Sequence, residues 1–249
     1  MIGLRALHVR LEGLTASFRH PLVITGTQIS TPMPAYSNLL GMMSACAGRT
    51  VRPEETRVGF EFHCESHDLE LERKDRWELK GGRLQRVTKK KVPRSIRIYS
   101  GHRAEEVPQG IGLRQVYWQP KLDLYVTNLN FKEFFERPAA TPCFGRSQDI
   151  AWIKWVRETE LYPVPKGSLG PTLIPYPQQG VPGFVVRLPE WFENRSMGLT
   201  RRAGPFGHYQ AMLPTVGKLR FAVERGDLFH PSDAAAEEHV IYLHRWLTE

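Results

Sequence analysis

Residues 37–64 read SNLLGMMSACAGRTVRPEETRVGFEFHC and predict a short helix followed by a strand. Ser37 as the N-cap and Gly48 beyond the last turn bracket a mostly apolar helix over 38–47. From 58 to 64, apolar residues alternate with polar or small ones, which is the period of a half-buried strand. A helix followed by a strand in this way is typical of mixed α and β folds.

The flanking sequence adds strands on both sides of this pair. Apolar and polar residues alternate over 4–11, which predicts another half-buried strand, whereas 15–34 lacks periodicity and predicts an extended loop. Further strands are predicted over 68–80, 83–91, 95–100, 114–118, 121–127, 184–188, 218–224 and 239–246, a helix over 130–137, and a strand or helix over 150–156. These elements predict an α+β domain with an antiparallel sheet.

Prolines and turn residues organise the chain further. The strands over 114–118 and 121–127 form a pair interrupted at Gln119-Pro120. Residues 162–183 hold six of the nineteen prolines and predict an irregular, extended segment. We therefore expect a core over residues 1–160, and a Pro-rich segment with C-terminal strands over 161–249 that completes the domain.

The composition is typical of a folded, non-membrane protein. The 249 residues are 41% hydrophobic and 24% charged, and no stretch reaches the roughly 20 apolar residues that a membrane span needs. Charged residues interrupt the first fourteen positions, so we expect no signal peptide. Three cysteines are few for this length, which predicts a cytoplasmic, reducing environment.

The positive charge is concentrated in one segment. The net charge is +8, yet residues 73–103 carry twelve Lys/Arg and two acids, a local charge of +10. The remaining 22 basic and 24 acidic residues sum to −2. A cationic stretch of this kind favours a polyanionic partner such as nucleic acid, and the alternative is a solvated hairpin kept soluble by its lysines.

This basic segment is predicted to be a protruding β-hairpin that turns at Gly81-Gly82. Aromatic residues in and near it, beside Lys and Arg, are typical of proteins that stack single-stranded bases; these are Trp77, Tyr99, Tyr117, Trp118 and Tyr125. The alternative is that these rings are half-buried sheet residues.

Motifs for catalysis or metal binding are missing from the sequence. It contains no phosphate-binding loop, no nucleophile elbow and no zinc-protease motif. His63, Cys64 and His67 lie close together, but a structural zinc site needs four ligands and no second pair follows. Metal-free RNA cleavage needs only an acid, a base and a cation, which His20, Tyr36, His102 and the lysines at 89–91 could supply.

Two motifs resemble a known family. Residues 15–48 place Phe18-Arg19 in an extended loop, a Pro-x-Pro step at 32–34, and Ser37-Asn38-Leu39-Leu40-Gly41 at the start of the helix. Residues 143–149, CFGRSQD, are similar to a Leu-Gly-Arg-Ser step. In this order they resemble the CRISPR-associated Cas-five family, which caps the 5′ handle of guide RNA (crRNA) in type I Cascade complexes. The resemblance covers about residues 1–160.

The resemblance implies a ferredoxin-like (RRM-related) antiparallel sheet with a basic β-hairpin thumb over about 73–103. It also implies a non-catalytic subunit without a cofactor or metal. Its partners would be crRNA, the CRISPR backbone (Cas-seven) subunits, the CRISPR large subunit and target DNA near the PAM. The RNA-binding candidates are Arg19, His20, Tyr36, Lys89, Lys90, Lys91, Arg94, Arg97, Gly145, Arg146 and Ser147. Arg19 and Arg146 would hold phosphates or base edges, and Gly145 would let the backbone approach the RNA.

One branch of the family, in type I-C systems, processes precursor crRNA with a tyrosine and a Lys-His pair. This sequence has no Lys-His dipeptide, which favours the non-catalytic reading. Two alternatives remain: a metal-independent endoribonuclease that processes precursor crRNA, and a ribosome- or messenger-associated binding module with a basic arm.

Overall fold

The computed structural model describes residues 3–20, 27–75, 77–86, 109–195, 200–214 and 219–247. Its main element is a six-stranded sheet in the order β15-β16-β9-β1-β8-β3. All neighbours in it are antiparallel except β16 and β9. In chain order the strands are β1 (Leu4–Gly13), β3 (Val58–His63), β8 (Lys121–Val126), β9 (Ala151–Leu169), β15 (Phe221–Pro231) and β16 (His239–Tyr242). The predicted antiparallel sheet is confirmed.

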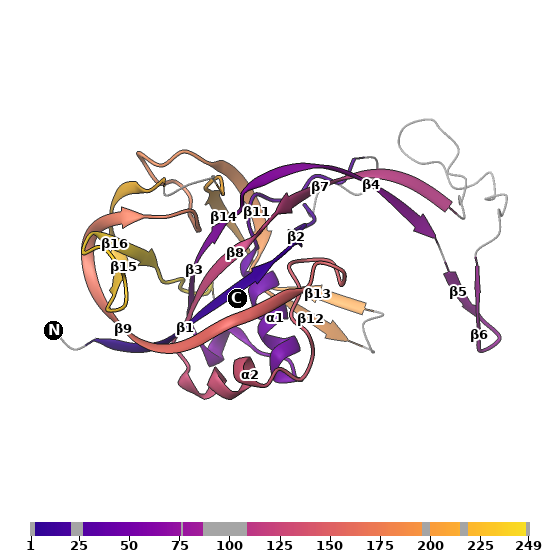
Figure 1. The fold of residues 1–249 in the computed structure, drawn as a ribbon, viewed down its shortest axis with the longest axis horizontal. Helices are drawn as coiled ribbons and strands as arrows, with labels where there is room; N and C mark the ends of the chain where they lie inside the picture. Colours follow the sequence, from indigo (N-terminus) through magenta and orange to yellow (C-terminus); the bar gives the residue numbers. More distant parts are fainter. Residues whose placement is uncertain are drawn as a thin grey trace.

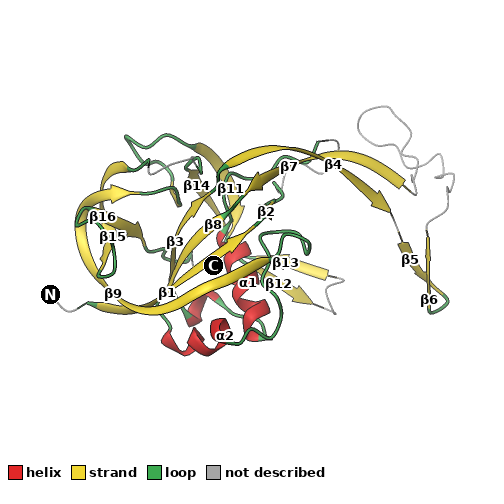
Figure 2. Ribbon diagram, viewed as in Figure 1, coloured by secondary structure: helices red, strands yellow, loops and turns green. Residues whose placement is uncertain are grey.

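Two α-helices pack on one face of this sheet (Figure 2). They are α1 (Tyr36–Ala47) and α2 (Lys132–Glu136), which follows the 3₁₀ turn η2 (Leu129–Phe131). Alternation in β1 sends Leu7, Val9 and Leu11 to this face, where they join the core with the apolar side of α1. Burial of these side chains is the main stabilising contribution.

The helix ends differ from the prediction at one side only. Gly48 ends α1 in the left-handed conformation, with φ 66°, as predicted. At the other end Ser37 is not the N-cap, because the helix begins at Tyr36, two residues earlier than predicted. The cap is Ala35, whose backbone N–H donates to the Asn38 side chain at 3.0 Å.

The sheet curls until its two sides meet. β9 is nineteen residues long, and its second half carries β15 and β16 around over the face opposite the helices (Figure 1). Leu243, just after β16, bridges Gly59 on β3, and the His244 N–H donates to the Val58 carbonyl at 2.8 Å. A small apolar cluster around Tyr125 fills the space so enclosed. The prediction of an irregular segment over 162–183 is therefore wrong over 162–169, which belong to β9.

His8 ties this covering layer to β1. Its Nδ1 lies 2.6 Å from Asp233, in the loop after β15, and its Nε2 lies 3.2 Å from Asp123 on β8. Burial by itself lowers the pKa of His8, but the two carboxylates outweigh it and raise the pKa above 6.5. The imidazole thus joins β1 to β8 and to the loop after β15.

Stability should therefore depend on pH through His8. A raised folded-state pKa contributes stability that is fully present below pH 6.5 and is lost as the pH rises through the folded value. In urea unfolding between pH 6 and 8, we expect the free energy of unfolding to fall more steeply for the wild type than for His8→Gln. His208→Gln, at an exposed histidine, should keep the wild-type slope. Equal slopes for wild type and His8→Gln would show that the imidazole is uncharged.

A two-stranded arm continues outward from the β3–β8 hairpin (Figure 1). It consists of β4 (Ser66–Asp75) and β7 (Gln109–Trp118), and β2 (Thr15–Ala16) pairs with the base of β7. The strands predicted over 114–118 and 121–127 both exist, but they are not a pair. The chain turns at Gln119, with φ 52°, so that β7 pairs with β4 and β2 while β8 pairs with β1 and β3.

The tip of the arm carries a second hairpin, β5 (Trp77–Lys80) and β6 (Arg83–Arg86). Gly81 and Gly82 form its turn with φ 57° and 75°, which confirms the predicted turn. Residues 87–108 lie outside the described residues, and with them the candidates Lys89, Lys90, Lys91, Arg94 and Arg97.

A smaller sheet joins β10 (Leu173–Pro175), β14 (Phe206–Ala211) and β11 (Phe184–Pro189). A separate hairpin pairs β12 (Phe192–Arg195) with β13 (Thr200–Ala203), and a 3₁₀ turn, η1 (Pro53–Glu55), precedes β3. β11 begins where a strand was predicted, whereas β12, β13 and β14 were not predicted. Within the described ranges, no helix has the length and apolarity to cross a membrane.

Candidate nucleic-acid interface

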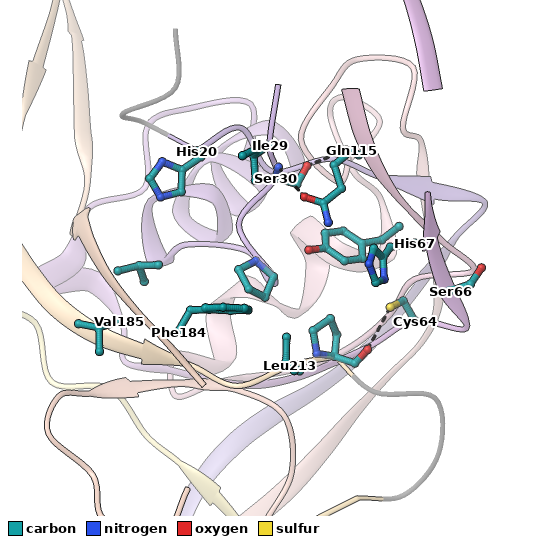
Figure 3. Close-up of a pocket in the computed structure, with 14 residues that line it drawn as sticks. His20, Ile29, Ser30, Cys64, Ser66, His67, Gln115, Phe184, Val185 and Leu213 are labelled. Carbon is teal, nitrogen blue, oxygen red and sulfur yellow. Dashed lines mark hydrogen bonds between the residues drawn. The ribbon is translucent and has the colours of Figure 1, made fainter. Parts of the chain in front are cut away.

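A groove of about 760 Å³ lies at the foot of the arm (Figure 3). Five segments meet there: the loop before α1, the start of β4, the base of β7, the start of β11 and the chain after β14. They contribute His20, Ile29, Ser30, Pro32, Cys64, Ser66, His67, Gln115, Tyr117, Phe184, Val185, Val186, Leu213 and Pro214. We call this site the foot groove.

Hydrogen bonds fix the polar end of the foot groove. Ser17 and Ser30 both donate through their hydroxyls to the backbone carbonyl of Gln115, at 2.9 and 2.8 Å. The Ser30 N–H donates to the Gln115 side-chain oxygen at 3.3 Å, which leaves the amide nitrogen of Gln115 as the outward donor. Figure 3 shows this amide pointing into the groove.

Aromatic rings form the walls of the foot groove. The rings of His67 and Tyr117 lie 5.9 Å apart at 47°, and Figure 3 shows His20 and Phe184 across the groove from His67. Burial raises the pKa of Tyr117, so its hydroxyl stays protonated and can donate. The arrangement offers π faces at the sides and hydrogen-bonding groups at one end.

The cysteine in the foot groove, Cys64, is buried. Burial raises the pKa of Cys64 to about 11, so the thiolate is scarce at neutral pH. The thiol donates instead to the Pro214 carbonyl at 3.2 Å, and so joins β3 to the segment after β14. Cys64 has a structural function at this point.

Arg146 lies on the other face of the arm, inside a network of carboxylates. Its guanidinium donates to Asp149 twice, each at 2.8 Å, and lies 3.3 Å from Glu70 and 3.7 Å from Glu72. The hydrogen bonds that Arg146 donates to Asp149 raise the pKa of Arg146 further above its usual value. The predicted RNA contact by Arg146 would therefore have to compete with these carboxylates.

Gly145 approaches protein rather than open space. Its φ is 109°, and a Cβ built there would lie 2.1 Å from the carbonyl oxygen of Ser17. The Ser17 N–H also donates to the Phe144 carbonyl at 3.0 Å. A glycine is needed so that the loop over 143–149 can pack on the segment that leads to Arg19.

The structure brings some of the predicted site residues together. The Gly145–Ser147 loop packs on Ser17, close in sequence to Arg19, which is exposed, and His20, which lines the foot groove. Ser147 is exposed as well.

Tyr36 was placed wrongly at the RNA interface. It is 1% exposed in the first turn of α1, where its ring stacks on His244 at 3.8 Å and its hydroxyl donates to the Leu173 carbonyl. Its surroundings are apolar or already bonded, so Tyr36 belongs to the core.

A metal site at His63, Cys64 and His67 was not expected, and among the described residues no group of three or more His, Cys, Asp or Glu is placed to hold a metal ion. The sequence did not indicate Gln115 or Phe184 as site residues, because no pattern links five separate segments. Tyr117 was noted only as one of several aromatic residues.

No protein-family model matches the sequence, and no curated protein matches it. Among solved structures, the chain is similar to a "CRISPR RNA-guided surveillance complex" chain at 14% identity and a TM-score of 0.47, over 88% of this chain and 91% of that one. The chain is also similar to a CRISPR protein from Archaeoglobus fulgidus, at 10% identity and a TM-score of 0.48, over 96% of this chain and 100% of that one. A third structure, of a Cas protein, is similar at 13% identity and a TM-score of 0.33, over 86% of this chain and 98% of that one. At these TM-scores, the function has to be inferred from the residues of the chain itself.

Proposed function

We propose that this chain is a non-catalytic crRNA-binding subunit of a type I CRISPR Cascade effector, where it caps the 5′ handle of the guide RNA. The observation that carries the proposal is the foot groove, which is lined by aromatic rings and lies at the base of the arm, whose far end leads into the basic segment over 73–103. Single-stranded RNA is bound by this combination of stacking rings and nearby cations.

A ferredoxin-like core is part of the proposal. The order β1-α1-β3-β8-α2-β9 along the chain, with β9-β1-β8-β3 across the sheet, supports it. The arm then corresponds to the thumb, since it extends from the hairpin of β3 and β8.

The arm also supports the proposed contact with a backbone subunit. Alternate residues of β4 and β7 point to one face, and on that face four large apolar side chains are 39–79% exposed. These are Leu69, Leu71, Ile111 and Leu113. An apolar patch of this kind usually marks a protein interface. The large subunit and target DNA near the PAM complete the proposed set of partners.

One observation favours a second function, a metal-independent endoribonuclease. His20 and His67 line the same groove, and a pair of histidines can act as acid and base in RNA cleavage. Against it, Tyr36 is buried and no Lys-His dipeptide is present.

The two functions differ in what happens to the RNA. The purified chain is incubated with end-labelled CRISPR repeat RNA in EDTA, and the products are separated on denaturing and native gels. Retarded, intact RNA with a preference for a free 5′ handle supports capping. A discrete cut that disappears in His20→Ala and His67→Ala identifies the ribonuclease. Failure to bind repeat RNA at any salt concentration would contradict both.

The basic segment should set the salt dependence of binding. Each phosphate neutralised on a single strand contributes about 0.7 to the slope of log K against log salt. We therefore expect Lys89→Gln, Lys90→Gln and Lys91→Gln together to reduce the slope by about 2, measured by fluorescence anisotropy. The control replaces Lys121, Lys154 and Lys166, which lie outside the arm, with Gln. An unchanged slope in the 89–91 variant would exclude these lysines from the phosphate contacts.

A further inference from the structure

The foot groove is shaped for a flat ligand with a polar edge. Its volume of about 760 Å³ lies within the usual range for small-ligand sites, and its rim holds large apolar side chains in partly exposed positions. Phe184, at 58% exposure, contributes an aromatic ring to this rim. Ile29, Val185 and Leu213 are 49–54% exposed in the same groove, and a gathered patch of exposed apolar side chains often marks a binding site.

The polar groups of the groove are gathered and oriented. The backbone N–H of Ser30 holds the side-chain amide of Gln115. The hydroxyls of Ser17 and Ser30 both donate to the backbone carbonyl of Gln115. A fixed amide donor beside the Tyr117 hydroxyl can read the edge of a base, whereas a purely apolar peptide side chain would leave both groups unpaired.

The charge of the groove fits a polyanion. None of the fourteen lining residues in the described part of the chain is acidic, while two are histidines and exposed Arg19 adjoins His20. The acidic residues of the arm base, Glu70 and Glu72, pair with Arg146 and Arg114 on the other face of the ribbon. Exposed Glu65, between the lining residues Cys64 and Ser66, has its carboxylate 3.9 Å from Lys121. The described lining itself carries no carboxylate that would repel a phosphate backbone.

From these observations we infer that the foot groove takes one unstacked nucleobase of the bound single-stranded RNA. The base lies between Phe184 on one side and His67 with Tyr117 on the other, and its edge meets the Gln115 amide. The phosphate beside it lies near Arg19. This inference rests on the proposed RNA-binding function and adds a site for one base, built partly from residues of the C-terminal half.

Abasic scanning tests the site without assuming which base it takes. Repeat RNAs with a single abasic nucleotide at each handle position are titrated against the full chain by fluorescence anisotropy. For the wild type, one position should lose about tenfold in affinity, the loss expected for one stacked base. With Phe184→Ala, and separately with His67→Ala, intact RNA should bind about tenfold more weakly, and the abasic penalty at that position should disappear.

A matched phenylalanine provides the control. Phe206, on β14 of the same sheet, is 43% exposed and lies outside the groove, so Phe206→Ala should keep both the affinity and the abasic penalty. If Phe184→Ala weakens every RNA equally, or if the wild type shows no sensitive position, the nucleobase site is wrong while RNA binding by the chain stands. If the wild type binds no repeat RNA, the proposed function fails and the site fails with it.

Discussion

Replacing Arg146 by Ala is expected to lower the free energy of unfolding by about 3–5 kcal/mol, the cost of leaving buried charge without its partner. Asp149 has no exposed side-chain surface, and Arg146 is the cation that compensates it. Thr15 donates to the same carboxylate at 2.6 Å, but a hydroxyl brings no charge. The loss should therefore far exceed the roughly 1–3 kcal/mol that one charged hydrogen bond to RNA would contribute to binding.

Urea unfolding at pH 7 measures this effect. Arg137→Ala, at an exposed arginine six residues before the loop over 143–149, should change stability by less than about 0.5 kcal/mol. Adding Asp149→Asn to Arg146→Ala should recover part of the loss, because it removes the uncompensated carboxylate. A variant that unfolds like the wild type but binds RNA more weakly would return Arg146 to the nucleic-acid interface.

Arg220→Ala is expected to destabilise the protein by a similar amount, about 3–5 kcal/mol, at the other end of the sheet. Arg220 holds the carboxylate of Glu61 with two nitrogens, one of them at 3.1 Å, and His239 lies 3.1 Å from the same group. Glu61 is on β3. Arg220 lies just before β15, and His239 is the first residue of β16. The ion pair therefore joins β3 to the strands that curl over the sheet.

The pH dependence of stability separates this pair from simple packing. Burial would raise the pKa of Glu61, but His239, His63 and Arg220 hold it well below its usual range. A depressed folded-state pKa contributes stability above pH 4.5 that is lost as the pH falls below that value. Urea unfolding between pH 5 and 2 should show a steep loss for the wild type and a shallower one for Glu61→Gln. Lys166→Ala, on an exposed residue of β9, is the control. A fully stable Arg220→Ala would show that the histidines alone neutralise Glu61.

Local patterns in the sequence predicted the elements that local physics determines. The strand over 4–11, the helix that Gly48 ends and the turn at Gly81-Gly82 are present because alternation, capping and positive φ act over a few residues. β9 was predicted only over 150–156, as strand or helix. Over 162–169 an irregular chain was predicted because of prolines such as Pro163 and Pro165, yet strand pairing with β15 keeps it extended.

The site was harder to predict than the fold elements. Tyr36 next to a proline-rich stretch suggested a loop, whereas packing against His244, over two hundred residues away, places it in the core. Arg146 in a Gly-Arg-Ser step suggested an anion contact, and only the tertiary structure shows the carboxylates around it. The foot groove depends on five segments that the sequence does not link.

The curled sheet has a consequence for how the protein is made. β1 pairs with β8 and β9, and the far side of β3 meets residues 243 and 244, so partners are separated by up to about 185 positions along the chain. The sheet cannot close until those late residues have left the ribosome, and the edge of β3 stays unpaired during most of synthesis. An open edge of this kind invites strand addition by other chains. Slow translation of the C-terminal strands, or their truncation, should therefore send the protein towards aggregates rather than towards a smaller folded form.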